Sequence, residues 1–355
     1  MIKVMHIFSR MNRGGAELRT MDTMKLLNRE FEFHVCATSG KKGELDDELE
    51  SMGIKVHYLD IKKFSFPFKF IKLLKKKNID VVHSHILFMS GLIQLLSFSS
   101  KVRNRITHFR TSKDSKEQYS KIRKARNKLL KTIVEIFSTK ILYVSNIANK
   151  NLISMKLFPK KHKTIYNGFE ISNINKNFEK KENSFIYVGR FIHTKNQCFL
   201  LDVIEILKKE FNTNIEITFV GNIETDYGKK FLSIANERDL NKNIKVIGEV
   251  NNPLDYLKTS EYFLFPSELE GLPGALIEAH LHNCIVISSN IKENSEVNQY
   301  FKDSSFELEL NPKTWASTIE KLISRKKQIR FNDSNVFDIN MTTQELKEIY
   351  MSKNL

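Results

Sequence analysis

Cysteine and tryptophan are scarce in this chain of 355 residues. Its three cysteines, Cys36, Cys198 and Cys284, lie far apart and form no C-x-x-C pair. This spacing speaks against a disulfide framework and against a thiolate zinc site, and it is typical of proteins from a reducing cytosol. The single tryptophan and the 41% content of hydrophobic residues suit a soluble globular protein.

Long hydrophobic runs are also missing. The longest uncharged apolar run, residues 86–100, is shorter than the roughly 20 residues that a membrane-spanning helix needs. We expect a buried helix there, with an interfacial segment as the alternative. The first residues, MIKVMHIFSR, do not resemble a secretory leader because Arg10 and Arg13 cut the apolar run short. A cytoplasmic protein is therefore expected.

Positive charge is abundant but unevenly distributed. Residues 1–165 carry 34 Lys and Arg against 14 Asp and Glu, a net charge of +20, whereas the remainder carries 23 against 27. Such asymmetry favours a polyanionic or membrane partner for the first half alone.

Short β-rich runs alternate with helical patterns along the chain, which predicts an α/β protein with parallel sheets. The length favours two domains. We expect domains at 1–169 and 185–335, joined by a polar linker at 170–184. A C-terminal helix within 336–355 could pack back on the first domain.

The expected strands all belong to this alternation. They are residues 3–8, 31–37, 55–59, 80–83, 105–108, 140–144, 163–166, 185–188, 216–220, 244–247, 262–265 and 285–288. The expected helices are residues 16–28, 44–52, 115–137, 195–209, 315–324 and 343–350.

Polar motifs follow several of these strands. Ligands of open parallel sheets bind beyond the carboxyl ends of the strands, so these motifs are expected to line a cleft between the two domains. The motifs are Gly14-Gly15, His108, Asn167, Gly189-Arg190, Gly221 and Glu270.

Two of these motifs suit phosphate. Gly14-Gly15 opens the first helix, where backbone N–H groups can approach an anion, although a tight turn explains the pair equally well. Arg190 and Lys195 form G-R-x4-K-N around a second strand-to-helix turn and offer a planar fork and a point charge. A solvated surface pair is the alternative.

The stretch PSELEGLPGALIEA places Glu270 in a loop and Glu278 inside the helix that follows Pro273. One carboxylate can accept hydrogen bonds from two neighbouring hydroxyls. The pair could therefore hold two polyols, such as a ribose and a hexose. A capping acid and a solvated glutamate remain the alternative.

No metal site is expected. His83 and His85 could share a strand face, but no acidic third ligand lies nearby in the sequence, and there is no clean D-x-D motif for a nucleotide-bound ion. His108 ends a strand and should point toward the cleft, although a structural histidine is the commoner outcome.

The long helix at 115–137 is basic and amphipathic, which suits an anionic membrane surface. An ordinary core-facing helix with a solvated charged face is the alternative. The cations expected on the membrane or acceptor face are Lys121, Arg123, Lys124, Arg126, Lys128 and Lys131.

Taken together, these motifs resemble the nucleotide-sugar glycosyltransferases of family 4, which have two facing Rossmann-like domains, the GT-B fold. The matching elements include Gly14-Gly15-Ala16-Glu17, Tyr166-Asn167-Gly168 and the E-x7-E pair Glu270 and Glu278. The order and spacing of the motifs cover nearly the whole chain. The similarity is to enzymes of bacterial capsule and exopolysaccharide synthesis.

The resemblance implies a role for each matching residue. Arg190 and Lys195 would bind the donor diphosphate, Glu278 the ribose and Glu270 the transferred sugar, with His108 near that sugar. The implied catalytic residues are His108, Glu270, Arg190 and Lys195. The implied donor-binding set is Gly14, Gly15, Asn167, Gly189, Arg190, Lys195, Gly221, Glu270, Gly271, Leu272 and Glu278.

The resemblance also implies a retaining enzyme that needs no metal. It implies no cofactor either, because the nucleotide-sugar, expected to be a UDP-sugar, is a substrate. A lipid-linked glycan or polysaccharide would be the acceptor, at the inner face of the plasma membrane, and no nucleic acid is expected. The sequence departs from the family at 282–285, where His-Asn-Cys-Ile replaces the usual Gly and Pro. Two rival functions remain: a UDP-sugar epimerase of the same fold, and a non-enzymatic binder of anions or lipid.

Overall fold

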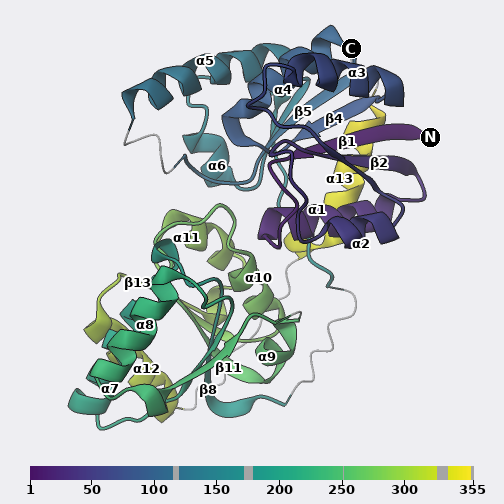
Figure 1. Ribbon diagram of the computed structural model, residues 1–355. Helices are drawn as coiled ribbons and strands as arrows, with labels where there is room; N and C mark the ends of the chain where they lie inside the picture. The colour runs from purple at the N-terminus through teal and green to yellow at the C-terminus, as the bar shows by residue number, and fades with distance from the viewer. Residues whose placement is uncertain (115–119, 172–178, 251, 326–334, 353–355) are drawn as a thin grey trace. The chain divides into compact units, whose positions relative to one another are not determined.

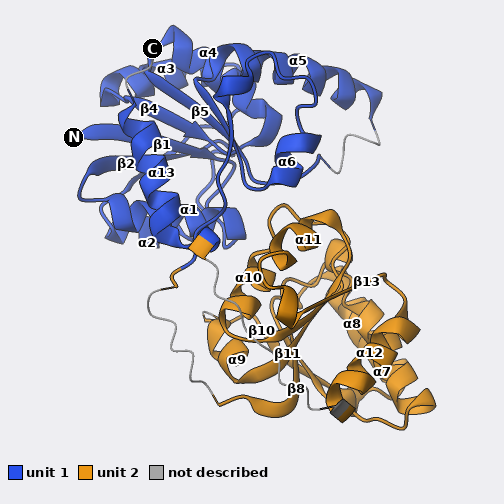
Figure 2. Cartoon of the chain, turned by 180° about the vertical axis from the view of Figure 1, so that it is seen from behind, with its two compact units in different colours: residues 1–169, 336–355 blue, residues 170–335 orange. Residues whose placement is uncertain are grey.

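The computed structural model describes residues 1–114, 120–171, 179–250, 252–325 and 335–352. They form two compact units (Figures 1 and 2). Unit 1 comprises Met1–Phe169 and Val336–Leu355, and unit 2 comprises Glu170–Asn335. Each unit contains a parallel sheet with helices on both faces, which confirms the predicted α/β class.

Unit 1 is built on a seven-stranded sheet of order β3-β2-β1-β4-β5-β6-β7. All neighbouring strands in it are parallel. The strands are β1 (Ile2–Phe8), β2 (Phe31–Ala37), β3 (Lys55–Tyr58), β4 (Val81–Ser84), β5 (Asn104–Phe109), β6 (Lys140–Tyr143) and β7 (His162–Thr164).

Helices cover both faces of this sheet. One face packs against α1 (Gly15–Leu27), α2 (Asp46–Ser51) and the C-terminal helix α13 (Ile339–Met351). The other packs against α3 (Phe66–Lys77), α4 (Ser90–Ser99) and α5 (Lys121–Phe137), with α6 (Asn146–Asn151) beside α5. The run expected as a buried helix forms a short turn, η1 (Leu87–Met89), and then the mostly buried α4. No helix in the described ranges is long and apolar enough to span a membrane.

Helix α13 joins segments that are distant in the sequence. It lies against α1 and β1, at the opposite end of the colour scale in Figure 1. Phe169 and Phe337 are hydrogen-bonded through their backbones where the chain leaves and re-enters unit 1. A Cβ atom on Gly168 would lie 2.4 Å from Cα of Ile339, so glycine lets the helix approach at this crossing.

Unit 2 is built on a six-stranded parallel sheet of order β10-β9-β8-β11-β12-β13. This is the strand order of a doubly wound dinucleotide-binding fold. The strands are β8 (Lys181–Val188), β9 (Ile217–Val220), β10 (Ile244–Gly248), β11 (Ser260–Phe265), β12 (Ile285–Ser289) and β13 (Ser305–Leu308).

The helices of unit 2 form two groups (Figure 1). Helix α7 (Cys198–Glu210) contacts α8 (Asp226–Glu237) and α12 (Pro312–Arg325). Helix α10 (Gly274–Leu281) contacts α9 (Leu254–Thr259) and α11 (Lys292–Asn298). The tryptophan side chain, Trp315, is fully buried in this unit.

Several boundaries differ from the predictions. Strand β8 begins at Lys181, inside the expected linker, because its first residues pair with Ser260 at the start of β11. Helix α5 begins at Lys121, where Ser120 caps it by accepting a hydrogen bond from the backbone N–H of Arg123; residues 115–119 of the expected helix lie outside the described ranges. Strand β13 has no counterpart among the predictions.

Candidate active site

The strand order of each sheet reverses next to its first strand. In unit 1 this switch point lies between β1 and β4, and in unit 2 it lies between β8 and β11. Loops that follow these strands diverge and leave room for a ligand beyond the strand ends. Most of the predicted site residues lie on these two pairs of loops.

Lys195 and Glu270 form an ion pair at the switch point of unit 2. Lys195 follows β8, Glu270 follows β11, and Nζ lies 2.5 Å from Oε1. The two side chains are 21% and 9% exposed, so the pair is largely shielded from water. Charge-assisted hydrogen bonds of this kind are short and strong, so the two side chains hold each other in place.

The loop that carries Lys195 is held by its own backbone. Lys195 ends a short 3-10 turn, η4 (His193–Lys195), rather than beginning the helix predicted for residues 195–209. The reason is Asn196, whose φ of 56° is left-handed and delays α7 until Cys198. Gln197 then donates a 2.8 Å hydrogen bond to the carbonyl oxygen of Arg190, which closes the loop on itself.

Arg190 is exposed. Its guanidinium makes no ion pair or side-chain hydrogen bond with any residue that the structure describes. Glu278 is half-buried on α10, and Gly271 and Leu272 are half-buried in the loop before that helix. These residues of unit 2 therefore lie on the loops after β8 and β11 and on α10, and their contact with a donor stays a prediction.

Gly189 and Gly221 have a packing explanation. Their φ angles of 155° and 143° are ones that L-residues rarely adopt. A Cβ atom on Gly221 would lie 2.2 Å from the carbonyl oxygen of Gly189, so the two loops touch through bare backbone. Close packing of the loops accounts for both glycines, and a contact with the donor stays a prediction.

Gly14 and Gly15 begin α1 in unit 1. Gly14 is the residue before the helix, and a Cβ on it would collide with the carboxylate of Glu17. A Cβ on Gly15 would meet no atom within 4 Å. The backbone at Gly15 is therefore open to a neighbouring molecule.

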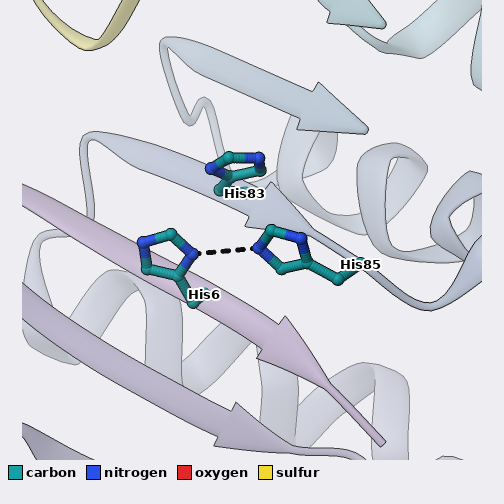
Figure 3. Close-up of side chains that lie close together, drawn as sticks. All are labelled: His6, His83 and His85. Atoms are coloured by element: carbon teal, nitrogen blue, oxygen red, sulfur yellow. Dashed lines mark hydrogen bonds between the residues drawn. The ribbon is translucent and has the colours of Figure 1, made fainter. Parts of the chain in front are cut away.

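A histidine cluster occupies the switch point of unit 1 (Figure 3). His6 lies on β1, His83 on β4 and His108 on β5, all on the face that α13 covers, and His85 follows β4. Nδ1 of His6 and Nε2 of His85 are 3.0 Å apart. Nε2 of His83 lies 3.2 Å from Nδ1 of His108, and its Nδ1 lies 2.8 Å from the hydroxyl of Tyr350.

These histidines are neutral near pH 7. Burial lowers the pKa of His6 to about 3, with the charge of Arg110 adding to the effect. Burial also holds the pKa values of His83, His85 and His108 well below the ordinary range. His108 consequently cannot act as an imidazolium acid in this state.

The same cluster contains a possible metal group. In the described part of the chain, His6, His83 and His85 can bring ligand nitrogens within 4.8 Å of one another. However, Nε of Arg110 donates a 3.2 Å hydrogen bond to Nδ1 of His85. His85 must then carry its proton on Nε2 and donate it to His6, so neither of these nitrogens offers a lone pair to an ion. The donor set does not suit a metal.

Arg110 joins this cluster to two other elements. Its NH1 donates to Oδ1 of Asn167 at 2.5 Å, and its NH2 donates to the hydroxyl of Thr20 on α1 at 2.9 Å. Asn167, which the motif places in the donor-binding set, is thus buried against Arg110.

Comparison with known proteins accounts for the two motif sets. Residues 13–173 match the family model described as Glycosyltransferase Family 4, and residues 169–334 match the model described as Glycosyl transferases group 1. The chain is 94% identical to the capsular polysaccharide biosynthesis glycosyltransferase CapH of Staphylococcus aureus, over 100% of both chains. The chain belongs to glycosyltransferase family 4.

More distant proteins are similar to this glycosyltransferase over most of its length. The UDP-Gal:alpha-D-GlcNAc-diphosphoundecaprenol alpha-1,3-galactosyltransferase of Escherichia coli is 24% identical, over 99% of this chain and 97% of the relative. The crystal structure of Anabaena HepE in complex with UDP and glucose superimposes with a TM-score of 0.79 at 17% identity, over 99% of this chain and 100% of HepE. This likeness confirms the GT-B type of fold.

Three side chains of the cluster in unit 1 were not predicted as site residues: His6, Arg110 and Tyr350. His6 has a weak signal, because it alternates with the core residues Val4 and Phe8 and so must share their face of the sheet. Arg110 is the first residue after β5. Tyr350 has no local signal, since it reaches His83 from 267 positions away.

Helix α5 of the glycosyltransferase carries two apolar stripes rather than one. Leu130 and Val134 are buried in unit 1, whereas Ile122, Leu129 and Ile136 point outward and are 84%, 63% and 50% exposed. Because the three exposed residues recur every seven positions, they form one line along the helix.

The cations expected on this surface divide in the same way. Lys121, Lys124, Arg126 and Lys128 are exposed. Arg123 instead turns inward and makes two hydrogen bonds, of 2.8 and 2.9 Å, with the carboxylate of Asp114, so its expected place on the membrane face is wrong. Lys131 is half-buried, with its Nζ 4.5 Å from the centre of the Phe88 ring.

Proposed function

We propose that this glycosyltransferase moves a hexosyl or N-acetylhexosaminyl group from a UDP-sugar to a lipid-linked acceptor, with retention and without a metal. The observation that carries the proposal is the shielded Lys195–Glu270 pair at the switch point of unit 2, where the exposed Arg190 lies on the same loop as Lys195. CapH acts in capsular polysaccharide biosynthesis and the Escherichia coli relative acts on a diphosphoundecaprenol-linked sugar, which supports a glycan built on a lipid carrier.

Each group in unit 2 has a task in this reaction. As the bond to the sugar breaks, negative charge grows on the departing diphosphate, and Lys195 and Arg190 would stabilise it in place of a metal ion. Glu270 would accept hydrogen bonds from hydroxyls of the transferred sugar, and Glu278 from those of the ribose. Gly271 and Leu272 would line the approach to the sugar.

Unit 1 would contribute neutral and backbone groups. The open backbone at Gly15 would approach the diphosphate, and His108 would act as a neutral hydrogen-bonding group close to the sugar. Electrostatic stabilisation of the leaving group by placed cations is worth about 10²–10³-fold per group in comparable sites.

The direct test compares two glutamates of one loop. Glu270→Gln should lower transfer from a radiolabelled UDP-sugar to an undecaprenyl-diphosphate-linked acceptor by at least about 100-fold. Glu268→Gln, at an exposed position two residues earlier, should leave transfer unchanged. Similar transfer rates for both variants would contradict the role proposed for Glu270.

The same assay separates the finer parts of the proposal. Proton NMR of the product gives the configuration at the anomeric carbon, and inversion would rule out retention. Activity that disappears with EDTA and returns with Mg²⁺ would rule out metal independence. Conversion of the UDP-sugar when no acceptor is present would instead indicate an epimerase.

The outer stripe of α5 supports a peripheral membrane association. Ile122, Leu129 and Ile136 form an exposed apolar line, and the nearby lysines can face anionic headgroups. Such a helix would bring the enzyme to a lipid-linked acceptor at the inner face of the plasma membrane.

Vesicle flotation tests this association. The protein should float with vesicles containing phosphatidylglycerol, less so at high salt, and Leu129→Ser should reduce the bound fraction. Leu232→Ser, at a 42% exposed position on α8 of unit 2, is the matched control. Equal binding by both variants, or binding to neutral vesicles alone, would contradict the proposal.

A further inference from the structure

Arg110 carries a positive charge that its hydrogen-bond partners do not neutralise. Three of its five N–H groups are used, and all three acceptors are neutral: Nδ1 of His85, Oδ1 of Asn167 and Oγ1 of Thr20. Across the described ranges, Arg110 forms no ion pair. The arrangement holds the side chain in place without cancelling its charge.

The neutrality of His85 follows from hydrogen-bond logic. A guanidinium can only donate, so His85 must present the lone pair of Nδ1 to Arg110 and keep its proton on Nε2. His6 accepts that proton's hydrogen bond at 3.0 Å (Figure 3). The histidines behind Arg110 therefore orient it and add no negative charge.

An arrangement of this kind is costly for a folded protein. Burial lowers the pKa of Arg110 to about 10, and the negative charge of Glu17 offsets only part of that effect. Buried or half-buried charges are ordinarily paired, and an arginine without a carboxylate partner is typical of a site that receives an anion. A fork of two N–H groups matches phosphate oxygens especially well.

The neighbourhood of Arg110 also suits an anion. Thr20, one of its partners, lies in the second turn of α1, and the N-terminus of this 13-residue helix has open backbone at Gly15. A helix N-terminus attracts negative charge. The unused N–H groups are one on each terminal nitrogen of Arg110, because Nε, NH1 and NH2 each make one hydrogen bond.

We propose that Arg110 is a diphosphate-binding residue of unit 1, oriented by three neutral acceptors so that its charge is available to an incoming ligand. The proposal rests on the sugar-transfer function, which supplies two diphosphates: that of the nucleotide donor and that of the lipid-linked acceptor. Both offer the same chemistry to a guanidinium.

Calorimetric binding to an Arg110→Met variant tests the proposal, with uridine, UDP and inorganic pyrophosphate as probes. Lys101→Met, an exposed position in unit 1, is the control. If Arg110 binds the donor, the variant should lose about 10- to 100-fold in affinity for UDP and pyrophosphate, but none for uridine. If it binds the acceptor, UDP affinity should hold while KM for the lipid-linked acceptor rises by a similar factor.

If Arg110 only stabilises the fold of unit 1, the result is different. The variant would then melt at a lower temperature, with unchanged affinity for UDP and pyrophosphate and unchanged KM for the acceptor, and the proposal would be overturned. If the wild-type chain binds neither UDP nor uridine, the proposed function fails, and the pyrophosphate titration alone decides the role of Arg110.

A second measurement needs no variant. Pyrophosphate should protect Arg110 of the wild-type protein from modification by phenylglyoxal, as mapped by mass spectrometry. Equal modification of Arg110 with and without pyrophosphate would overturn the proposal even if Arg110→Met does not fold.

Discussion

The two units share one architecture and use it for different electrostatics. Each has a parallel sheet whose strand order reverses beside the first strand, and each gathers polar side chains there. Unit 2 places an ion pair, Lys195–Glu270, at this point. Unit 1 places neutral histidines around the unpaired charge of Arg110.

Their surfaces differ as well. The residues of unit 1 include 36 Lys and Arg against 17 Asp and Glu, and those of unit 2 include 21 against 24. One fold therefore supports a strongly basic unit and a mildly acidic one. The comparison teaches that the fold determines where a ligand binds, at the switch point of the sheet. A few side chains at that point determine which kind of ligand binds there.

Removing the ion pair of unit 2 should have the largest effect. Lys195→Met leaves the shielded carboxylate of Glu270 without its cation and removes a charge from the proposed leaving-group site. We expect transfer to fall about 10²–10³-fold and unit 2 to lose about 3–5 kcal/mol of stability.

Turnover and the fluorescence of Trp315 during urea unfolding measure these two effects. Lys208→Met, at an exposed position on α7, is the control and should change neither. Equal turnover in the two variants would show that the ion pair is not part of the site.

Replacing Gly168 by alanine, at the point where α13 crosses the chain, should destabilise unit 1 and leave the stability of unit 2 unchanged. The new methyl group of Gly168→Ala would lie 2.4 Å from Cα of Ile339, so α13 must shift. We expect unit 1 to lose about 2–3 kcal/mol, read from circular dichroism, while the unfolding of unit 2 at Trp315 stays in place. Gly15→Ala, where no atom lies within 4 Å, should leave the stability of unit 1 unchanged.

Acid should destabilise the two units at different pH values, so no mutation is needed to tell them apart. The seven histidines of unit 1 all have lowered pKa values, whereas in unit 2 His280 and His282 do. The unfolded chain therefore binds more protons than the folded one below a pH of about 6.5. The stability that the neutral histidines contribute is fully present above that pH. It is lost as the pH falls toward the pKa values of the folded state.

For His6 alone, with a folded pKa of about 3, the loss by pH 5 is about 2 kcal/mol. Circular dichroism, which sees both units, should change at a higher pH than the fluorescence of Trp315, which reports unit 2. A fluorescence change that comes first would contradict the expectation.

The smallest predicted effect concerns Gly15 and function. Because the site above Gly15 is open, Gly15→Ala should fold normally but hold the diphosphate less closely. We expect KM for the UDP-sugar to rise about tenfold, which corresponds to about 1.4 kcal/mol. An unchanged KM would mean that no ligand approaches this backbone.

Local patterns were sufficient to predict the α/β class and many of the strands. Residues 31–37 form β2 as expected, because a run of β-formers between turns needs no distant information. The arrangement of Arg190, Lys195 and Glu270 around one switch point was predictable too, since all three follow strands. Their catalytic roles remain predictions.

Other features depend on contacts that no local pattern encodes. The cluster of His6, His83 and His108 requires that β1, β4 and β5 be neighbours in register. The two stripes of α5 could not be separated in the sequence, because Leu129 and Leu130 are adjacent and equally apolar, and only packing sends one inward. Asn196 marks a further limit, since asparagine is compatible with a helix but here adopts a left-handed turn.

Helix α13 also has a consequence for how the protein is made. The seven strands of unit 1 are synthesised before unit 2, yet Leu346, Ile349 and Tyr350, which together with α1 and α2 cover one face of that sheet, are synthesised after it. At about 5–20 residues per second, unit 1 cannot complete its core until the whole of unit 2 has been synthesised and α13 has followed. We therefore expect a stop codon within α13 to leave unit 2 intact and one face of the sheet of unit 1 incompletely covered.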